Sequence, residues 1–598
     1  MKLVRSSLFA FFALAATACG SSGSDSSSTT APSGNGSQPT PPATATDAQR
    51  AIAEADIIQL EGNLLFAMSK SGTVSVVDVS EPARLVLAGQ TTIPGQPFEM
   101  YFRDGVLLAM SNAAIHSDGS AYASTDDSAS DPGAGAMVTT LDVHDPSKPQ
   151  TLSTYVIPGE IADSRIVGDV LYLVTYENAQ CYRCGTAPRT MLTSFDAKQP
   201  TNIQPIDQAS FASTAPDAYN LPWGSAWKRS IFATDTRLYI GGHADIDPST
   251  YDTGSEPEGI IDVVDISDPG GKLAAGARLH VGGAVLSRWQ MDERNGIFRV
   301  VSERGAGRTG NGVAMPDVDT FTIESTTSYV PLGHTTLALP RQEGLRTVRF
   351  DDQVAYAITY NQTDPLFTID LSQPASPTVR GALSMPGFMF YLEPHGDRLI
   401  GLGVDRTDPN GSLNVSLFDV SNLDSPKMLQ RVAFGAKDLG EDYAILNYEL
   451  PEDQDRIQKA FRVFDDGLVV VPFTSSSSYY DSDGCSTNAS GVQMVEWQSD
   501  TLVKRALLPV SGNPRRAFEH MGEMVTVSDS NVRSFSLARR DAALQTADLV
   551  IGSCVAKTLP QGLGAVGEGD YAPAYGGYAY ACAASPARAG APAWPGAL

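Results

Sequence analysis

Two cysteines in the sequence have a spacing that could support redox or metal chemistry. Cys181 and Cys184 form a CxxC motif, which occurs in redox dithiols and as half of a zinc site. The residues around them show no βαβ pattern, and the chain has no second CxxC or HxxxH motif to supply the remaining zinc ligands. We therefore expect a local disulfide between these two cysteines, in a long loop outside the cytoplasm.

An acidic loop at residues 479–485 has the beginning of a calcium-binding pattern. Asp481 and Asp483 are followed by Gly484, as in an EF-hand loop. The twelfth position of such a loop needs a bidentate Glu, and here it is Val492. We therefore expect no cofactor, with a weak calcium site at Asp481 and Asp483 as the alternative.

The remaining cysteines and the histidines show no pattern that is typical of a catalytic centre. Cys554 and Cys582 flank the start of the C-terminal segment and are candidates for a second disulfide, which would leave Cys485 as the odd thiol. The seven histidines are scattered without metal-binding spacing. No GxSxG elbow, phosphate-binding Gly loop or dinucleotide fingerprint occurs in a suitable strand–helix context. The sequence therefore predicts no catalytic residue and no metal ligand.

The charge balance limits the possible partners. The chain has 42 Lys and Arg against 68 Asp and Glu, for a net charge of −26. Binding to nucleic acid needs clustered positive charge, so we expect no nucleic-acid partner. An anionic lipid surface is disfavoured for the same reason.

The N-terminus has the pattern of an export signal. Lys2 and Arg5 precede an apolar stretch at residues 8–18, which is too short to span a bilayer as a helix. Residues 16–19 read Ala-Thr-Ala-Cys and resemble the lipobox of bacterial lipoprotein signal peptides, although that family usually has Leu at the first of these positions. The resemblance implies cleavage before Cys19 and lipidation of its thiol; the alternative is an ordinary secretory peptide cut after Ala18.

The segment that follows has the composition of a spacer. Residues 20–47 are almost entirely Ser, Gly, Thr, Pro, Ala and Asp, which cannot bury enough apolar surface to fold. We expect a disordered linker between a lipid anchor at residue 19 and a folded domain. Gly20 in place of Asp after the cysteine favours the outer membrane, if the organism is a double-membrane bacterium.

The rest of the chain is a repeat of short strands. Residues 345–387 and 388–434 each contain a strand pair around a polar turn, a strand ending in Asp, and a fourth strand. Four consecutive antiparallel strands per repeat make one propeller blade. The same paired strands occur at 55–69, 99–111, 163–176, 227–242, 286–302, 345–360, 388–404, 457–472 and 515–528. We therefore predict an all-β fold, a single closed β-propeller of four-stranded antiparallel blades, with eight or nine blades.

Ring closure removes exposed sheet edges. We expect the last strand, residues 547–552, to join the first blade, so that both ends of the chain share one sheet.

A recurrent Asp marks the end of most connecting strands. Each is followed by a Pro a few residues later, and the carboxylate can accept hydrogen bonds from N–H groups of the turn. One Asp per repeat at one structural position favours a turn role over a metal site. These residues are Asp78, Asp142, Asp265, Asp370 and Asp419.

The phrases "DPLFTIDLSQPASP" and "MPGFMFYLEPHGDRLIGLG" carry a family resemblance. They resemble bacterial secreted proteins with a C-terminal β-propeller domain distantly related to WD repeats. Matching phrases at 54–69, 291–303 and 458–472 extend the resemblance over roughly residues 50–540. That family has no common substrate or catalytic residues, so the resemblance implies the fold and no site.

These observations predict four segments: a signal peptide (1–18), a lipidated Cys with its linker (19–47), a propeller domain (48–552), and a mostly disordered Ala/Gly/Pro/Tyr-rich tail (553–598). We expect a monomeric binding or scaffolding module of the bacterial cell envelope, whose partner is an envelope protein or a glycan and whose only contact with the membrane is the N-terminal lipid. The alternative is a secreted hydrolase or lyase, whose metal or carboxylate site would gather in the propeller channel from separate blades.

Overall fold

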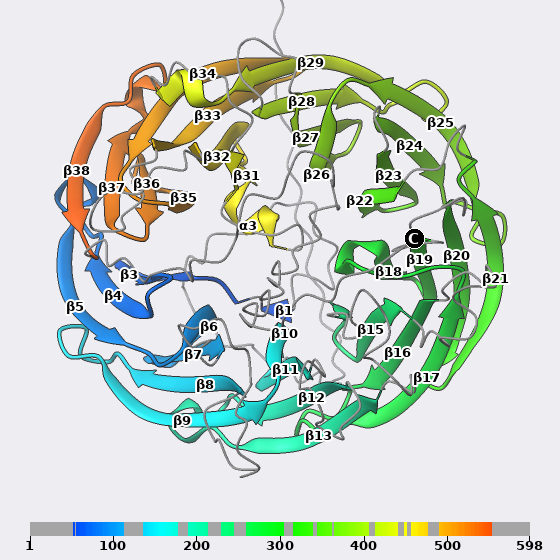
Figure 1. Ribbon diagram of the computed structural model, residues 1–598, viewed down its shortest axis with the longest axis horizontal. Helices are drawn as coiled ribbons and strands as arrows, with labels where there is room; N and C mark the ends of the chain where they lie inside the picture. Colours follow the sequence, from blue (N-terminus) through cyan, green and yellow to red (C-terminus); the bar gives the residue numbers. More distant parts are fainter. Residues whose placement is uncertain are drawn as a thin grey trace, which may run out of the picture. The chain divides into compact units, whose positions relative to one another are not determined.

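Nine antiparallel sheets follow one another around a ring in the computed structural model (Figure 1). The structure describes residues 52–53, 55–112, 135–177, 189–212, 229–243, 259–303, 315–338, 344–360, 364–405, 413–439, 448–450, 456–475 and 489–552. The all-β propeller is confirmed, and the number of blades is nine. Among the described residues there is no helix with the length and apolarity needed to cross a membrane.

Each blade runs from an inner strand to an outer strand (Figure 1). Blade 1 contains β2 (Ile58–Glu61), β3 (Leu64–Met68), β4 (Thr73–Asp78) and β5 (Val86–Thr92); blade 2 contains β6 (Gln96–Arg103), β7 (Val106–Asn112), β8 (Gly135–Asp142) and β9 (Gln150–Pro158); blade 3 contains β10 (Glu160–Val167), β11 (Val170–Glu177), β12 (Arg189–Asp196) and β13 (Pro205–Ala212), with β1 (Ile52–Ala53) added at its inner edge. Blade 4 contains β14 (Ser230–Ala233), β15 (Arg237–His243), β16 (Gly259–Asp265) and β17 (Ala274–Val281); blade 5 contains β18 (Met291–Arg294), β19 (Ile297–Glu303), β20 (Pro316–Ser325) and β21 (Ser328–Thr336); blade 6 contains β22 (Gly344–Asp351), β23 (Val354–Tyr360), β24 (Asp364–Asp370) and β25 (Thr378–Met385). Blade 7 contains β26 (Phe388–His395), β27 (Arg398–Val404), β28 (Leu413–Asp419) and β29 (Lys427–Phe434); blade 8 contains β30 (Tyr448–Glu449), β31 (Arg462–Val463), β32 (Leu468–Ser475), β33 (Ser490–Gln498) and β34 (Thr501–Val510); blade 9 contains β35 (Pro514–His520), β36 (Glu523–Ser528), β37 (Asn531–Ser536) and β38 (Gln545–Val550).

Helix is confined, within the described residues, to short turns. The four-residue helix α3 (Ile457–Ala460) precedes β31. The 3₁₀ turns are η1 (Pro82–Arg84), η2 (Pro200–Asn202), η3 (Arg288–Gln290), η4 (Ala436–Leu439) and η5 (Leu537–Arg539). The sequence pattern of residues 457–472 predicts two paired strands, and this is wrong for the first four residues. Residues 457–460 form a helix, and only Arg462–Val463 pairs with β32.

Tight turns join the two inner strands of several blades. Asp104 and Gly105 have φ of 46° and 74°, and Asn295 and Gly296 have φ of 51° and 74°. Such left-handed pairs form the hairpin turns that match the twist of the flanking strands, and Asp, Asn and Gly adopt them at low cost. The turn dipeptides of the sequence therefore place the hairpins.

The hydrophobic core lies between neighbouring blades. Successive side chains of a strand point to opposite faces of its sheet, so one blade contributes to the packing on both of its sides. Val301 and Val318 of blade 5, for example, are buried in one cluster with Val348, Ala355 and Phe367 of blade 6. Each blade therefore depends on its neighbours for burial.

The proline-containing turns lock neighbouring blades together through glycines. A Cβ atom on Gly381 of β25 would lie 2.3 Å from the Leu423 carbonyl oxygen and 2.8 Å from Pro426 Cδ of the next blade. Thr368 Oγ1 donates a hydrogen bond to the same Leu423 oxygen (2.6 Å). The same arrangement recurs at Gly89 and Gly333, where a Cβ would lie 2.4 Å and 2.3 Å from a proline carbonyl oxygen. The turn of one blade thus packs directly on the backbone of the blade before it.

The recurrent aspartates lie at the ends of β4, β8, β16, β24 and β28. Each carboxylate accepts a hydrogen bond from the backbone N–H two residues further on, at 2.8–3.0 Å: Ser80 to Asp78, His144 to Asp142, Ser267 to Asp265, Ser372 to Asp370 and Ser421 to Asp419. Their contribution to turn stability stays a prediction.

Ring closure differs from the sequence expectation. We expected residues 547–552 to join the first blade, and this is wrong: β38 pairs with β37 within blade 9, and blade 1 is complete with its own four strands. Blades 9 and 1 instead share a hydrophobic cluster that includes Phe518 and Val525. Gln90 Nε2 of blade 1 also donates a hydrogen bond to the Ile551 carbonyl oxygen (2.5 Å). Closure therefore uses side chains rather than an exchanged strand.

Gly381→Val tests the lock between blades. The new side chain would meet a backbone carbonyl that no rotamer change can avoid, so we expect the free energy of unfolding to fall by about 3 kcal/mol. Ala382→Val places the same valine side chain at an exposed position of the same strand and is the control. Urea unfolding measures both, and equal midpoints for the two variants would contradict the lock.

The Asp370→Asn/Asp419→Asn variant tests the turn aspartates. Hydrogen bonds from Ser372 and Ser421 lower the pKa of these two carboxyls. The folded state therefore binds fewer protons than the unfolded state near pH 3–4, and their stabilisation is present above the ordinary pKa and lost as pH falls.

Asn keeps an oxygen acceptor but does not titrate, so we expect a shallower loss of the melting temperature between pH 6 and pH 3 in this variant. Asp104→Asn, at an exposed hairpin tip, is the control. A double variant with the same acid dependence as wild type would contradict the assignment.

Candidate functional site

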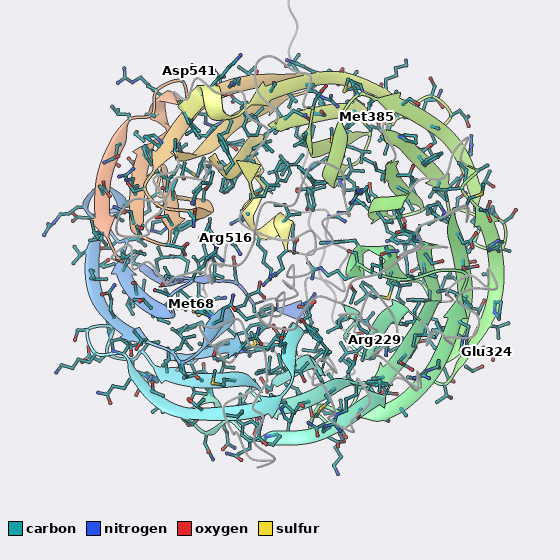
Figure 2. The ribbon with its side chains drawn as sticks, in the orientation of Figure 1. Met68, Arg229, Glu324, Met385, Arg516 and Asp541 are labelled. Carbon is teal, nitrogen blue, oxygen red and sulfur yellow. The ribbon has the colours of Figure 1, made fainter. Side chains whose placement is uncertain are left out.

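Charged and polar side chains gather on the inner strands of the ring. Charged side chains are seldom buried unless they are paired, yet several here are: Glu99, Arg165, Asp292, Arg349, Glu393 and Arg516. Figure 2 shows Arg516 on the inner side of its blade, with Glu324 and Asp541 at the outer rim. The ring centre is therefore the place where chemistry-bearing residues converge.

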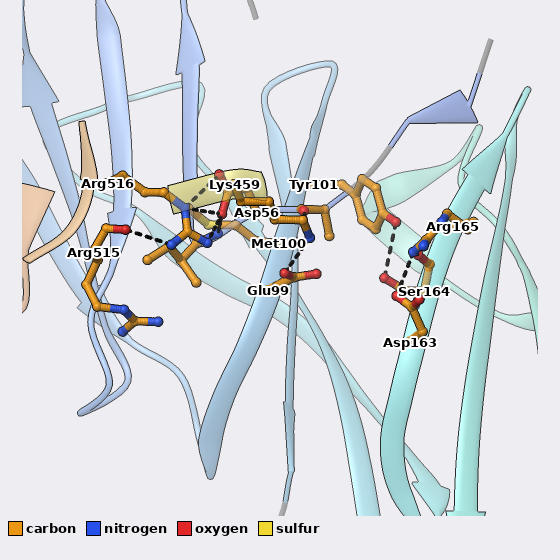
Figure 3. A network of polar contacts seen from close by, with 12 residues as sticks. Asp56, Glu99, Met100, Tyr101, Asp163, Ser164, Arg165, Lys459, Arg515 and Arg516 are labelled. Atoms are coloured by element: carbon orange, nitrogen blue, oxygen red, sulfur yellow. Dashed lines mark hydrogen bonds and ion pairs between the residues drawn. The ribbon is translucent and has the colours of Figure 1, made fainter. Parts of the chain in front are cut away.

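An ion pair joins blade 9 to the chain entering blade 1. Arg516 Nε lies 2.9 Å and 3.1 Å from the two carboxylate oxygens of Asp56, and Arg516 Nη2 donates to Oδ1 (2.5 Å) (Figure 3). Nη1 of the same guanidinium donates to the Arg515 carbonyl oxygen (2.8 Å). The Arg516 side chain is 1% exposed and the Asp56 side chain 23% exposed, so the arginine is buried and the carboxylate is partly open to solvent.

A second buried pair joins blade 8 to blade 2. Lys459 Nζ, on α3, lies 2.5 Å from Glu99 Oε1 and 2.7 Å from the Ala55 carbonyl oxygen (Figure 3). The guanidinium carbon of Arg456 lies 4.7 Å from the centre of the Phe98 ring. Burial raises the pKa of the Glu99 carboxyl, and the positive charge of Lys459 opposes that rise. The α3 segment thus reaches from its own blade to the inner strand of blade 2.

The N-terminal residues connect these two pairs. Ile52 and Ala53 pair with Val167 and Ile166 at the inner edge of blade 3, and Asp56 exchanges two backbone hydrogen bonds with Met100 of blade 2 (3.2 and 2.9 Å). We call residues 52–53 and 55–56 the central strap. With Lys459 on the Ala55 oxygen and Arg516 on Asp56, the central strap contacts blades 2, 3, 8 and 9.

Blade 3 contributes a further buried pair. Arg165 Nη1 lies 2.5 Å from Asp163 Oδ1, and the Tyr101 hydroxyl of blade 2 lies 3.1 Å from Ser164 Oγ (Figure 3). Burial would raise the pKa of Asp163, but the charges of Arg165 and Arg288 outweigh it and hold the pKa below its ordinary value. Asp163 is therefore ionised and held by cations from two blades.

Arginines and aromatic rings alternate where blades 5, 6 and 7 meet. The guanidinium carbons of Arg349 and Arg288 lie 3.9 Å and 4.4 Å from the centre of the Trp289 ring. Arg349 also lies 4.3 Å from the Tyr391 ring, and the Tyr391 hydroxyl donates to Glu393 Oε2 (3.3 Å). The distances are those of cation–π contacts.

The described ring centre holds both basic and acidic side chains. The basic side chains include Arg165, Arg288, Arg349, Arg456, Lys459, Arg462 and Arg516, and the acidic ones include Asp56, Glu99, Asp163, Asp292, Glu393 and Glu519. Burial lowers the pKa of Arg462, against the opposing charges of Asp56 and Glu393.

The predicted site residues fall into two groups. The lipidation, disulfide and calcium predictions stay predictions, because their residues lie outside the described part of the chain. These residues are Cys19, Cys181, Cys184, Cys554, Cys582, Asp481 and Asp483. The five turn aspartates lie at the end of the third strand of their blades and not among the charged residues of the ring centre. Within the described ranges, no three His, Cys, Asp or Glu side chains come together in a way that could hold a metal ion.

Sequence reasoning missed the central charges. Arg165, Arg349 and Glu393 all lie two residues before the end of an inner strand, as Val167, Asp351 and His395 show. A charged residue at that register position in the hairpins of blades 3, 6 and 7 was a signal that could have been found in the sequence. The ion pairs of Lys459 with Glu99 and of Arg516 with Asp56 had no such signal, because the partners are 360 and 460 residues apart.

The chain belongs to the family described as the beta propeller domain, whose model matches residues 44–538. It is 36% identical over 156 residues to an uncharacterized protein of Methanocaldococcus jannaschii and 34% identical over 160 residues to one of Archaeoglobus fulgidus. These matches cover 25% and 27% of this chain and 23% of each relative, so the chain spans about a quarter of the relatives' length. Both relatives are archaeal, and the bacterial lipoprotein character stays a prediction.

Solved structures that are similar to this chain match it with low TM-scores and low sequence identity. BamB from Moraxella catarrhalis is 12% identical with a TM-score of 0.34, over 80% of this chain and 96% of BamB. The dihydro-heme d1 dehydrogenase NirN is 12% identical with a TM-score of 0.36, over 62% of this chain and 64% of that protein. Nothing about the ligands of this chain follows from similarity at this level.

Lys459→Met tests whether α3 is fixed to blade 2 by the buried ion pair. The substitution leaves the Glu99 carboxylate buried without its cation, which typically costs about 3–5 kcal/mol. We expect Glu99→Gln in the Lys459→Met background to recover part of that loss, because the uncompensated charge is removed.

Lys504→Met is the matched control, since Lys504 pairs with Asp438 at a more exposed site and such pairs contribute about 1 kcal/mol or less. Chemical unfolding of these three variants and of wild type measures the differences. Equal losses for Lys459→Met and Lys504→Met would show that the central pair does not hold α3.

Proposed function

We propose that this protein is a lipid-anchored binding module of the cell envelope, which presents the propeller to an envelope protein or a glycan outside the cytoplasm. Acylated Cys19 supplies the anchor, residues 20–47 the spacer, and the ring a rigid frame. Stable anchoring needs more than one acyl chain or a second signal, and lipidation of the cysteine thiol and of the new amino group would meet that need.

The observation that carries a binding role is the pairing of the central carboxylates. Asp56, Glu99 and Asp163 each lie beside a basic side chain, and two of these three partners come from another blade. Such pairs fix the positions of the inner strands, whereas a general acid or base must exchange its proton with a substrate within hydrogen-bond reach. A preorganised, charged surface on a rigid scaffold is suited to recognition.

Cys19→Ser tests the anchor. We expect wild-type protein expressed with its leader in a double-membrane bacterium to require detergent for extraction and to incorporate labelled palmitate. The Cys19→Ser protein should be soluble and unlabelled, because it lacks the thiol that is acylated. Cys485→Ser is the control, and labelling that persists in Cys19→Ser would contradict the lipoprotein assignment.

A pull-down from solubilised envelope tests the binding role. We expect the purified mature chain, and not a heat-unfolded sample of it, to retain an envelope protein or glycan, because the proposal places recognition on the folded ring. A metal assay on the same sample completes the test. Recovery of no partner together with a stoichiometric bound metal would overturn the proposal in favour of a secreted hydrolase or lyase.

A further inference from the structure

We propose that two copies of this protein associate through strand β9, whose free edges pair with each other as antiparallel strands. β9 (Gln150–Pro158) is the outermost strand of blade 2, and no other described strand pairs with its outer edge (Figure 1). The inference goes beyond the proposed function and does not depend on it, because the contact needs neither the lipid anchor nor an envelope partner. It replaces the expectation of a monomer.

The outer strand of a blade has a row of backbone N–H and C=O groups without a strand partner. Each blade has one such edge, and an added strand can pair with it through its own backbone. Soluble proteins commonly protect such edges with charged side chains, with proline or with very short strands. The nine outer strands can therefore be compared by how well each edge is protected.

β9 lacks the features that protect or interrupt the other outer strands. β5 contains Gly89, and β21 contains Pro331 and Gly333. β9 has nine residues, with no charged residue and with neither Gly nor Pro before its last position. Each of the six remaining outer strands contains at least one charged residue: Asp207 in β13, Arg278 in β17, Arg380 in β25, Lys427 and Arg431 in β29, Lys504 and Arg505 in β34, and Asp548 in β38.

A shift in register does not distinguish β9. Every blade has such a shift between its third and fourth strands, and in blade 2 the shift falls between Thr140 and Leu141. Beyond it, Ser153 to Pro158 pair with β8 residue by residue. This part of β9 is therefore a regular strand with a free outer edge.

The exposed side chains of β9 are of the kinds that strand pairing favours. Leu152 and Val156 are 42% and 47% exposed, and Thr154 between them is also exposed. β-branched residues are enriched in strands, and their cross-strand pairs stabilise sheets. A strand added to this edge would remove apolar surface of Leu152 and Val156 from water.

The absence of charge favours a second copy as the added strand. Two identical strands bring the same charges to one contact, so a strand such as β29, with Lys427 and Arg431, would repel its own copy. β9 brings no charge to the contact. At physiological salt, exposed charges are screened beyond about 8 Å, so the net charge of −26 on each chain opposes the contact only weakly.

Two-fold symmetry gives this contact a definite size. In an isologous pair both copies use the same surface, so one antiparallel contact covers the β9 edges of both chains. Among the described outer strands only β9 lacks charge and interruption, so no second edge remains for further growth. The expected assembly is a closed dimer.

Sedimentation velocity of the Cys19→Ser protein over a dilution series tests this inference. A strand pair buries less surface than a permanent dimer interface, so we expect a reversible equilibrium of monomer and dimer. Val156→Lys should raise the dissociation constant of the dimer about tenfold or more, because it places a charge on the paired edge. Val86→Lys, at a side chain that is 45% exposed on β5, is the matched control and should leave the equilibrium unchanged.

Hydrogen exchange locates the contact without a substitution. We expect amides of β9 to exchange more slowly at high than at low protein concentration, while amides of β5 exchange equally at both. If Val156→Lys unfolds the chain, this comparison decides.

A protein that stays monomeric throughout the series would overturn the inference, and so would a dimer that folded Val156→Lys leaves unchanged. Association beyond two copies would also overturn it, because one edge per chain closes at the dimer. Such failures leave the proposed function standing. An envelope partner that protects the β9 amides of a monomeric protein would support a binding module and would assign this edge to that partner instead of a second copy.

Discussion

The buried contact between Arg516 and Asp56 holds the two ends of the propeller together. The Arg516 guanidinium is 1% exposed. Taking such a charge out of water is costly, and the cost is offset only by good geometry and by additional hydrogen bonds. Arg516 donates to both oxygens of Asp56 and to the carbonyl of Arg515. Asp56 in turn is fixed to blade 2 through two backbone bonds with Met100. The ring therefore closes at its centre, by ionic and backbone contacts of the central strap.

Two different kinds of contact hold the blades in sequence. At the outer strands, a proline-containing turn of one blade packs on a glycine of the blade before it, as Leu423 and Pro426 do on Gly381. At the inner strands, charged side chains pair across blades, as Lys459 does with Glu99. The outer contacts repeat because the sequence repeats, whereas the inner contacts are particular to individual blades. The ring centre is therefore the part of the fold whose side-chain contacts do not repeat from blade to blade.

The repeated features were the predictable ones. All nine hairpins could be located from alternating apolar residues and turn dipeptides such as Asp104–Gly105, because those rules act over a few residues. Residues 457–460 were wrongly predicted as strand: their helix packs against blade 2 through Lys459, so a distant tertiary contact and not the local pattern decides its conformation. The closure was mispredicted for a similar reason, since Asp56 and Arg516 are 460 residues apart. The contacts of Arg288 and Arg349 with the Trp289 and Tyr391 rings were not predicted, because they join side chains of three different blades.

Native-state hydrogen exchange on wild type and Asp56→Ala tests most directly whether the central strap closes the ring. If the strap is the closure, loss of the Asp56 carboxylate should reduce amide protection along β2, β6 and β35, while protection in β17 and β21 of the distant blades is unchanged. Protection lost only at residues 52–56, with β2 and β35 as protected as in wild type, would contradict the account and would leave the hydrophobic cluster of blades 9 and 1 as the sole closure.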